Sequence, residues 1–429
     1  MAAFHTTDEL DPGQRLLVRI DVNAPIEDGE VQSTRRFERH AESIRELLDA
    51  GHALAIMAHQ GRPGRDTFTG LEQHAFILSD LVGEEIEYVP STFGEEAVEA
   101  IADLEPNPDA ASAGAEDAAG DADTTGEAIL LENVRMTDGE LPEEPPEVKA
   151  QTEFVRTLAK AFDGYVNDGY SVAHRSHASI VGFPEVMDSY AGPVMADEYE
   201  YNTSVERREF DGDVTMVLGG TKAEDVIAAM DHLEDTVDTF LLGGVVGELF
   251  LRARGHPVGH DLEDGPDLYD ENYEKNEDLI ADVLDRFGDR IETPVDLAYE
   301  DENGERAEHA VVDVEEKTVS YMDIGHETVE AYRPIVEDSA AVLVKGALGV
   351  FEDERFSYGT VEVLRAAGES DAFCVVGGGD TARTVPMYDL DPAGFDHLSI
   401  AGGAYLQALT GEGLVGVDAL ERAAERMDG

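Results

Sequence analysis

The sequence predicts an α/β protein of two lobes, each a parallel β-sheet with helices on both faces. Short apolar runs alternate with helical patterns along the whole chain, as expected of strands joined by crossover helices. A polar, charged stretch at residues 198–213 separates two halves that each show this alternation. The length of 429 residues, with 42% hydrophobic residues, supports more than one core. We therefore expect two Rossmann-like lobes joined by a hinge.

The first half, residues 1–197, supplies one lobe. Its expected strands are Arg15–Ile20, Ala53–Ala58, Ala128–Leu131 and Tyr165–Asn167, and its expected helices are Phe37–Ala50, Leu71–Val82 and Gln151–Phe162. In the first helix Ile44, Leu47 and Leu48 share one face, and Gly51 is placed to end it. Residues 105–127 are mostly Ala, Asp and Gly with almost no large apolar side chain. This composition predicts a mobile, acidic surface insertion.

The second half, residues 214–403, repeats the alternation. Its expected strands are Val214–Leu218, Thr239–Leu242, Ala340–Val344, Phe373–Val376 and His397–Ile400, with a helix at Lys222–Leu233. We interpret residues 198–213 as the interdomain hinge segment. Residues 404–429 are expected to return toward the first lobe.

The chain is extremely acidic, with 95 acidic and 30 basic residues and a formal net charge of -65. Such self-repulsion destabilises a compact fold in dilute buffer, but ~1 M salt shortens the Debye length to about 3 Å. The composition therefore indicates a protein made for a very salty cytoplasm. An acidic disordered protein is disfavoured because apolar residues recur periodically throughout. A role as an acidic decoy for basic partners stays open.

The sequence gives no sign of export or membrane insertion. We find no secretory leader and no apolar run of the ~20 residues that a membrane helix needs. The single cysteine, Cys374, cannot form an internal disulfide, which favours a reducing compartment. We expect a cytoplasmic protein without nucleic-acid, membrane or obligate protein partners.

Cationic side chains follow the expected strands of the first half. They are Arg36, His59, Arg62, Arg135, His174, Arg175 and His177, accompanied by Asp21 and Asn23 after the first strand. Ligands of open parallel sheets bind beyond the carboxyl ends of the strands. Arginine binds carboxylate and phosphate oxygens in bidentate fashion. Any one of these arginines could simply pair with a surface acid, but the set predicts a site for a small, multiply anionic ligand.

Glycine-rich turns follow the expected strands of the second half. They are Gly219-Gly220-Thr221-Lys222, Gly243-Gly244, Gly377-Gly378-Gly379-Asp380-Thr381 and Gly402-Gly403-Ala404. Glycine lets the backbone approach a ligand, and N–H groups at a helix N-terminus bind phosphate. An aspartate after such a turn suits Mg²⁺, which takes one or two carboxylates together with substrate phosphates. One glycine turn is usually plain turn geometry, whereas this series predicts a nucleotide.

Together the two halves predict phosphoryl transfer. This chemistry needs charge stabilisation and in-line positioning, with little covalent work by the protein. One lobe would present cations and the other a nucleotide. We expect the lobes to close during the reaction and so to exclude water.

Seven segments carry a resemblance to a known family. In chain order they are VRIDVNAP at 18–25, AHQGRP at 58–63, LLENVR at 130–135, NDGY with AHRSHAS at 167–179, GGTK at 219–222, GVFE at 349–352 and GGGDT at 377–381. Together they resemble the phosphoglycerate kinases, of the type found in halophilic archaea. The family patterns V-R-V-D-F-N-x-P, S-H-L-G-R-P and G-G-A-K stand at the corresponding places, and LLENVR and GGGDT match unchanged.

The resemblance implies reversible phosphoryl transfer between 1,3-bisphosphoglycerate plus ADP and 3-phosphoglycerate plus ATP. By position, the phosphoglycerate would be bound by Asp21, Asn23, Arg36, His59, Arg62, Arg135, His174 and Arg175. The nucleotide would be bound by Lys222, Gly243, Gly244, Lys345, Glu352, Gly377, Gly378, Gly379, Asp380 and Thr381. Within this set the glycines at 243 and 244 would line the adenine pocket, Glu352 would bind ribose, and Asp380 would hold Mg²⁺. The catalytic groups would be Arg36, Lys222 and the helix N-terminus at Gly379.

Three departures from the family pattern fall on the nucleotide side. Val226 stands where the family commonly has a second lysine. Lys345 replaces the asparagine of the N-G-P that precedes G-V-F-E, and it could restore the missing charge. Ile400 and Ala401 interrupt the late S-T-G-G-G-A. These changes leave room for altered nucleotide affinity.

Two rival functions remain from the sequence. A related carboxylate kinase would form another acyl phosphate, and assays of several acids with ATP would separate it from a phosphoglycerate kinase. An anionic-metabolite sensor with the same fold would bind ligands without turnover, which Lys222 and Asp380 argue against.

Salt should stabilise this protein steeply. A net charge of -65 repels itself, and the repulsion falls as ions screen it. Thermal melts in dilute buffer and in about 3 M KCl should therefore show a much higher Tm in salt. An unchanged Tm would contradict the halophilic interpretation. The apparent KM for the anionic substrate should change less steadily with salt, because salt relieves the overall repulsion but also weakens the local arginine contacts.

Overall fold

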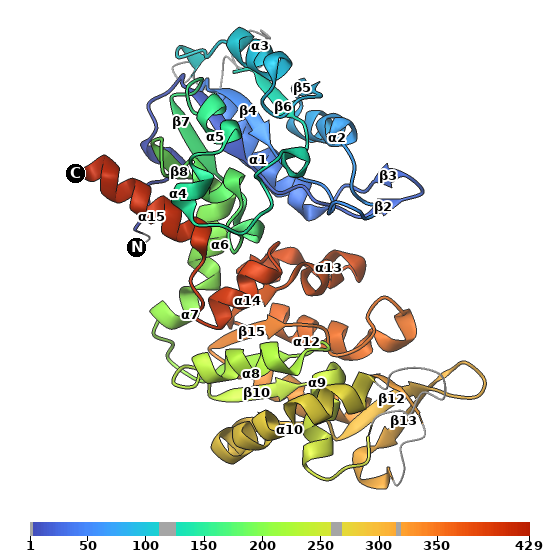
Figure 1. Cartoon of the computed structure of the whole chain (residues 1–429). Helices are drawn as coiled ribbons and strands as arrows, with labels where there is room; N and C mark the ends of the chain where they lie inside the picture. Colours follow the sequence, from blue (N-terminus) through green and yellow to red (C-terminus); the bar gives the residue numbers. More distant parts are fainter. Residues whose placement is uncertain (1–2, 111–125, 259–267, 315–318) are drawn as a thin grey trace. The chain divides into compact units, whose positions relative to one another are not determined.

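The computed structural model describes residues 3–110, 126–258, 268–314 and 319–429 (Figure 1). The chain divides into two compact units. Unit 1 contains Met1–Glu200 and Gly413–Gly429, and unit 2 contains Tyr201–Glu412. The first division falls inside helix α6 (Pro193–Asn202). The second follows helix α14 (Gly403–Leu409), so that helix belongs to unit 2.

Unit 1 is built on a six-stranded sheet whose pairings are all parallel, in the order β5-β6-β4-β1-β7-β8. The strands are β1 (Arg15–Arg19), β4 (Ala53–Met57), β5 (Ile86–Val89), β6 (Ala128–Leu131), β7 (Gly164–Asn167) and β8 (Ser189–Ala191). A short hairpin pairs β2 (Ile26–Glu27) with β3 (Glu30–Val31). The expected strands are confirmed, while β5 and β8 were not predicted because their short sequences lack a continuous apolar run.

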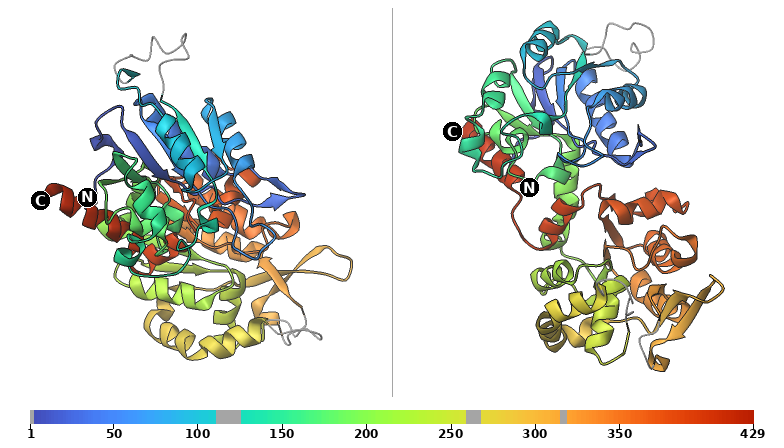
Figure 2. Two further views of the ribbon diagram at one scale, coloured as in Figure 1. Left: turned by 45° about the horizontal axis from the view of Figure 1, so that its top comes forward. Right: turned by 45° about the vertical axis from the view of Figure 1, so that its right-hand side comes forward.

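Helices cover both faces of this sheet. The helices of unit 1 are α1 (Arg35–Asp49), α2 (Glu72–Val82), α3 (Glu95–Asp103), α4 (Pro146–Lys149), α5 (Glu153–Leu158), most of α6, and α15 (Val415–Asp428). Leu16 and Val18 of β1 belong to the core under α1 and α2, whereas Leu17 belongs to the core on the opposite face. This alternation is the period of two expected of a strand covered on both sides. Figure 2 shows α15 lying beside β8, which it contacts.

Glycine ends two of the predicted helices. Gly51 follows α1 with φ of 77°, and Gly83 follows α2 with φ of 86°. Both values are left-handed, and glycine adopts them without steric cost. The helix expected at 151–162 is shorter in the structure, where α5 covers only Glu153–Leu158.

Unit 2 repeats the architecture with a parallel sheet of order β11-β10-β9-β15-β16-β17. Its strands are β9 (Val214–Leu218), β10 (Thr239–Leu242), β11 (Ile291–Glu292), β15 (Ala341–Lys345), β16 (Phe373–Gly377) and β17 (His397–Leu398). Its helices are α7 (Ser204–Arg207), α8 (Ala223–His232), α9 (Gly244–Ala253), α10 (Leu268–Phe287), α11 (His326–Glu337), α12 (Tyr358–Glu369), α13 (Gly379–Met387) and α14.

Unit 2 also holds a small antiparallel sheet that the sequence did not predict. It consists of β13 (Arg306–Ala310), β12 (Asp296–Glu300) and β14 (Tyr321–Ile324), in that order. The polar, half-buried sequence of β13 and the end of β12 explain the omission, since these residues give no apolar strand signal.

The acidic insertion expected at 105–127 lies partly outside the described residues, at 111–125. Its described flanks belong to the fold. Asn107 N donates to Gly51 O at 2.8 Å, Gly126 N donates to Leu48 O at 3.0 Å, and Leu54 N donates to Glu127 O at 2.7 Å. These hydrogen bonds tie the flanks to unit 1, although Glu105, Pro108, Asp109 and Glu127 are exposed, and the interpretation of the whole segment as a surface insertion stays a prediction.

Replacing 111–125 by a short Gly-Ser linker should change the free energy of unfolding by less than about 1 kcal/mol, because closure entropy varies slowly with loop length. Deleting all of 105–127 should cost about 3 kcal/mol, at about 1 kcal/mol for each of three backbone hydrogen bonds lost. Denaturant unfolding of both variants in molar salt measures the difference. Equal stability of the two variants would contradict this division of the segment.

Candidate active site

A buried carboxylate lies at the carboxyl edge of the unit 1 sheet. Asp21 follows β1, which pairs with β4 on one side and β7 on the other, and is only 2% exposed. Arg36 Nη1 lies 3.3 Å from Asp21 Oδ2, and His59 Nδ1 lies 3.4 Å from Asp21 Oδ1. The Ser171 hydroxyl donates to the same carboxylate. Burial acts to raise the pKa of Asp21, but Arg36, the Ser171 hydrogen bond and Arg19 hold it well below its usual range.

Backbone and side-chain hydrogen bonds tie the neighbouring loops together. Gly61 N donates to Asn23 Oδ1 at 2.8 Å, and Arg36 Nη1 donates to Asn23 O at 3.2 Å. The guanidinium of Arg135 donates to Gly61 O. The loops that follow β1, β4 and β6 therefore form one connected rim, which brings together the predicted residues Asp21, Asn23, Arg36, His59 and Arg135.

The imidazoles of this rim are neutral at pH 7. Burial lowers the pKa of His59 well below its usual value, and it lowers that of His174 to about 4 and that of His177 to about 3. Nearby arginines lower all three further, Arg175 in the case of His174. His174 Nδ1 is buried without a partner. Neutral imidazoles present one N–H donor each, which suits an anionic oxygen.

Two predicted arginines keep their guanidinium groups available. Arg62 is exposed and Arg175 is half-buried. No hydrogen bond or ion pair within the described ranges reaches either guanidinium, although the chain is rich in acids. The interpretation of these residues as routine surface ion pairs is therefore not supported. Both remain predicted ligands of an anion.

Four residues that contact the rim or its neighbours were not predicted as site residues from the sequence. Arg19 and Glu140 are buried to 1% and 0% exposure, and His40 is fully buried in α1. His40 accepts from Asp21 N at 3.2 Å and contacts Asp168 Oδ2 at 3.0 Å. Asp168 in turn accepts from Val194 N at 2.8 Å at the start of α6. The one available signal was Arg19 itself, a charge inside an otherwise apolar strand.

Glycines bring the turns of unit 2 into backbone contact. Gly219 N donates to Lys345 O at 2.9 Å, and a Cβ on Gly219 would lie 2.1 Å from Ala347 O. A Cβ on Gly377 would lie 1.7 Å from the Tyr405 ring. Larger residues would therefore push the turns apart at both places. The close packing leaves the turns after β9, β10, β15 and β16 at one edge of the sheet.

Four helices of unit 2 begin without a side-chain cap, at the turns after β9, β10, β16 and β17. They are α8, α9, α13 and α14, whose N-cap residues are Lys222, Gly243, Gly378 and Gly402. The first N–H groups of a helix have no intrahelical partner and carry a partial positive charge. Uncapped termini at one sheet edge suit a ligand with several phosphates.

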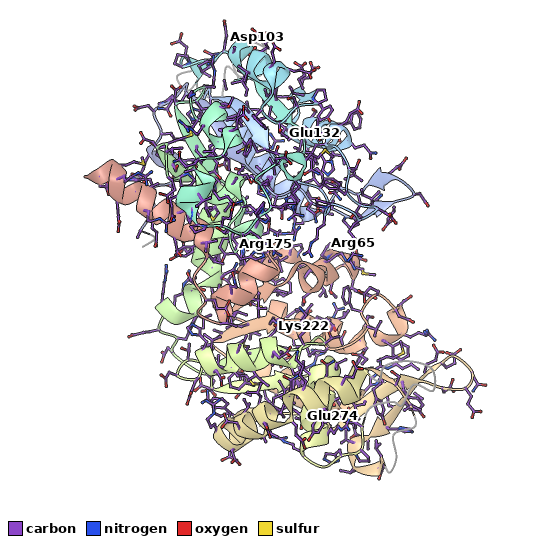
Figure 3. All side chains as sticks on the ribbon, in the orientation of Figure 1. Arg65, Asp103, Glu132, Arg175, Lys222 and Glu274 are labelled. Carbon is purple, nitrogen blue, oxygen red and sulfur yellow. The ribbon has the colours of Figure 1, made fainter. Side chains whose placement is uncertain are left out.

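Lysines stand beside these termini. Lys222 is exposed at the start of α8 and is labelled in Figure 3. Lys345 ends β15, in register with Leu218 of β9 and Gly377 of β16. Burial lowers the pKa of Lys345, Asp225 opposes this, and Lys222 lowers it further, so the two ammonium groups share one region. Val226 is fully buried in the core-facing side of α8.

The remaining predicted nucleotide residues lie near α13. Gly378, with φ of 92°, is its N-cap, Gly379 is its first residue and Thr381 is buried in its first turn. Glu352 is exposed, and its Oε1 lies 3.8 Å from Arg383 Nη2 of the same helix. Asp380 is the second residue of α13, and its side chain lies outside the described parts. Its role as metal ligand stays a prediction.

A hollow of ≈ 670 Å³ lies along α2 and β5, but its lining, which includes Glu72, Asp80 and Phe76, contains none of the predicted site residues. Across the described ranges, no three His, Cys, Asp or Glu side chains gather into a metal cage. None of the described helices is both long and apolar enough to cross a membrane.

Cationic side chains at the sheet edge of one α/β unit, and uncapped helix termini behind glycine turns in the other, are features expected of a two-unit phosphotransferase. The model of the phosphoglycerate kinase family matches residues 8–412. The chain is 61% identical to the phosphoglycerate kinase of Halorubrum lacusprofundi, over 99% of this chain and 100% of that protein. It is 57% identical to the Haloarcula marismortui enzyme, over 98% and 100%. The chain belongs to the phosphoglycerate kinase family.

A solved structure agrees with this assignment. The crystal structure of phosphoglycerate kinase from Pyrococcus horikoshii OT3 superposes with a TM-score of 0.87 at 31% identity, covering 98% of this chain and 99% of that one. The chain is an ATP-dependent phosphotransferase with a carboxyl group as acceptor, acting between 1,3-bisphosphoglycerate plus ADP and 3-phosphoglycerate plus ATP. The family membership decides against both the sensor and the kinase for another carboxylic acid.

Stability should fall as the pH drops from about 6.5, the unfolded histidine pKa, toward about 4. His174 and His177 have lowered pKa values of about 4 and about 3, so the unfolded chain takes up protons first. The variant His177→Gln should lose less stability over this pH range than the natural protein. Thermal melts at several pH values in molar KCl measure both slopes. Parallel slopes would show that His177 is not held neutral by the fold.

Proposed function

We propose that unit 1 binds the phosphoglycerate and unit 2 binds the nucleotide. The observation that carries this assignment is the rim around Asp21, where Arg36, His59 and Arg135 converge while Arg62 and Arg175 keep unpaired guanidinium groups. A strongly anionic three-carbon substrate matches this donor set. The buried carboxylate of Asp21 accepts hydrogen bonds, so it suits the substrate hydroxyl group rather than its anionic ends.

Arg36 is the proposed catalytic cation of unit 1. It holds Asp21 and Asn23 O through one nitrogen, Nη1, at 3.3 and 3.2 Å. A guanidinium carries five N–H donors in a rigid fork, a geometry that suits the oxygens of a migrating phosphoryl group. Preorganised positive charge at the transferring group is the main contribution a protein makes to this reaction.

Unit 2 supplies the proposed nucleotide site. The uncapped N-terminus of α13 at Gly379, together with Lys222, would stabilise the phosphates, and Gly243 and Gly244 would line the adenine pocket. Glu352, Gly377, Gly378 and Thr381 complete the proposed set, with Glu352 at the ribose. Support comes from the strand order, which places β9, β15 and β16 side by side and so brings their turns together.

Mg²⁺ is the proposed cofactor, held by Asp380. Asp380 follows a glycine turn at the start of α13, and Mg²⁺ takes one or two carboxylates together with substrate phosphates. When bound, the ion neutralises charge on the phosphate oxygens. The protein's own groups would orient the nucleotide, because backbone N–H groups at the N-terminus of α13 and at the flanking glycines would donate hydrogen bonds to its phosphates.

Lys345 is proposed as the second phosphate-binding lysine of unit 2. A lysine at position 226 would enter the core, because Val226 is fully buried. Lys345 instead stands between the turns that begin at Gly219 and Gly378, and its ammonium group has no hydrogen bond or ion pair within the described ranges. Burying part of a charged ammonium group costs free energy unless an anion pairs with it. A bound phosphate would supply that anion.

The proposed reaction requires a hinge between the units, and we also propose a cytoplasmic location. The phosphoryl donor and acceptor must come into line, so the proposed hinge at residues 198–213 would let the substrate-loaded units close and exclude water. The single buried cysteine, Cys374, agrees with a reducing cytoplasm.

Arg36→Ala should lower kcat by ~10²–10³ while changing the KM for 3-phosphoglycerate far less, because its charge acts mainly on the transferring group. The matched control is Arg39→Ala, on the same helix, whose Nη2 lies 2.7 Å from Asp197. Coupled assays with ATP and 3-phosphoglycerate in molar KCl measure both constants. A normal kcat for Arg36→Ala would remove Arg36 from the catalytic set.

Lys345→Met and Asp380→Ala should each raise the KM for Mg-ATP and leave the KM for 3-phosphoglycerate near normal. Loss of one phosphate contact costs about 1.5–3 kcal/mol, or roughly 10–100-fold. Full kinetic surfaces over both substrates in molar KCl provide the test. An equal loss of affinity for both substrates would contradict the division of ligands between the units.

A further inference from the structure

A buried arginine lies directly behind the substrate rim of unit 1. Arg19 is 1% exposed, and its guanidinium is fully engaged. Nε donates to Ser179 Oγ at 3.0 Å, Nη1 donates to Ile20 O, and Nη2 lies 3.2 Å from His59 Nδ1. These three direct partners are uncharged when His59 is neutral, so the charge of Arg19 must be balanced from further away.

The contact between Arg19 and His59 fixes the tautomer of the imidazole. Guanidinium groups have donors but no acceptor. Nδ1 of His59 must therefore accept the hydrogen bond from Nη2, and the single imidazole proton resides on Nε2. The 3.4 Å approach of Asp21 Oδ1 to Nδ1 is then a packing contact without a hydrogen bond. His59 presents Nε2–H as its donor.

The orientation of Arg19 depends in turn on Ser179 and Glu140. Because Ser179 Oγ accepts from Arg19, its hydroxyl proton is free to donate, and Glu140 Oε1 receives it at 2.7 Å. Ser179 N donates to Glu140 Oε2 at 2.8 Å. Glu140 is completely buried, and burial raises its pKa above the usual value, although Arg19, the hydrogen bonds from Ser179 and Lys149 act in the opposite direction. Lys149 Nζ donates to the backbone carbonyls of Gly139 and Glu140.

We propose that Glu140 is a positioning residue for the phosphoglycerate site, acting through Ser179 and Arg19 to hold His59 with its proton on Nε2. The proposal rests on the assignment of the substrate to unit 1. Glu140 itself touches no substrate; it balances the buried Arg19 and fixes the serine hydroxyl. Every hydrogen bond in the series Glu140–Ser179–Arg19–His59 then has one defined direction, which leaves one donor facing the ligand.

The first test is the tautomer of His59 in the natural protein. Nitrogen-15 NMR of histidine-labelled protein in molar KCl, with His59→Gln for assignment, should show a neutral imidazole protonated on Nε2. A proton on Nδ1, or a charged ring at pH 7, would overturn the proposal without any variant of Glu140. Addition of 3-phosphoglycerate should shift the Nε2 signal. An Nε2 proton whose signal does not respond would instead count against substrate binding in unit 1.

The second test separates positioning from stability. Glu140→Gln and Ser179→Ala should each raise the KM for 3-phosphoglycerate about tenfold, the effect of one misplaced hydrogen bond, with the KM for Mg-ATP unchanged. The double variant should be no worse than the single ones, because both act through Arg19. Additive effects, or unchanged KM values in folded protein, would overturn the proposal.

The chain offers a matched control in unit 2. Asp296 is 4% exposed, and its Oδ1 accepts from Thr328 N at 2.8 Å and from Thr328 Oγ1 at 2.6 Å, so it is a buried acid bound to a hydroxyl residue as Glu140 is, but with both bonds on one oxygen. Asp296→Asn should lower the Tm and leave the KM for 3-phosphoglycerate unchanged. An equal rise of this KM in Asp296→Asn would show a general effect of destabilisation and overturn the specific role of Glu140.

Discussion

The balance of charge around the buried Asp21 is the interaction on which the substrate site depends. A carboxylate removed from water is costly unless it is paired and hydrogen-bonded. Arg36 and Ser171 meet this requirement from α1 and from the segment after β7, and His59 packs against the carboxylate from the loop after β4. Three loops that are distant in sequence are thereby fixed around one point. The same contacts hold the cations of the proposed substrate site in place, so stability and the proposed binding share one set of residues.

A second constraint comes from the acidity of the chain. A net charge of -65 repels polyanionic substrates at long range, so attraction must act over the few ångströms that molar salt leaves unscreened. The structure meets this with half-buried arginines in unit 1, and with backbone N–H groups and two lysines in unit 2. Backbone dipoles at a helix N-terminus need no basic side chain. This explains how so few lysines suffice for the proposed nucleotide site.

Backbone packing does in unit 2 what charge pairing does in unit 1. Gly219 and Gly377 allow turns and the Tyr405 ring to approach more closely than any side chain would permit. The helix N-termini behind these turns are consequently held at one edge of the sheet by hydrogen bonds such as that from Gly219 N to Lys345 O. The same packing explains why the second lysine stands at position 345 and not at position 226. Lys345 is the last residue of β15 and lies at that edge, whereas Val226 of α8 is buried in the core.

The sequence by itself determined the two parallel sheets and the family, and it predicted the residues of the proposed site, because apolar periodicity reports burial and because the residues after each strand must gather at one sheet edge. Only the tertiary structure decided the partners of Arg19, since Ser179 and Glu140 are distant in the chain and no local pattern pairs them. It also decided that the flanks of the acidic insertion pack as part of unit 1, and that β12–β14 form a separate sheet. Contacts between distant segments follow from strand order and side-chain reach, and these are properties of the folded chain that local sequence does not encode.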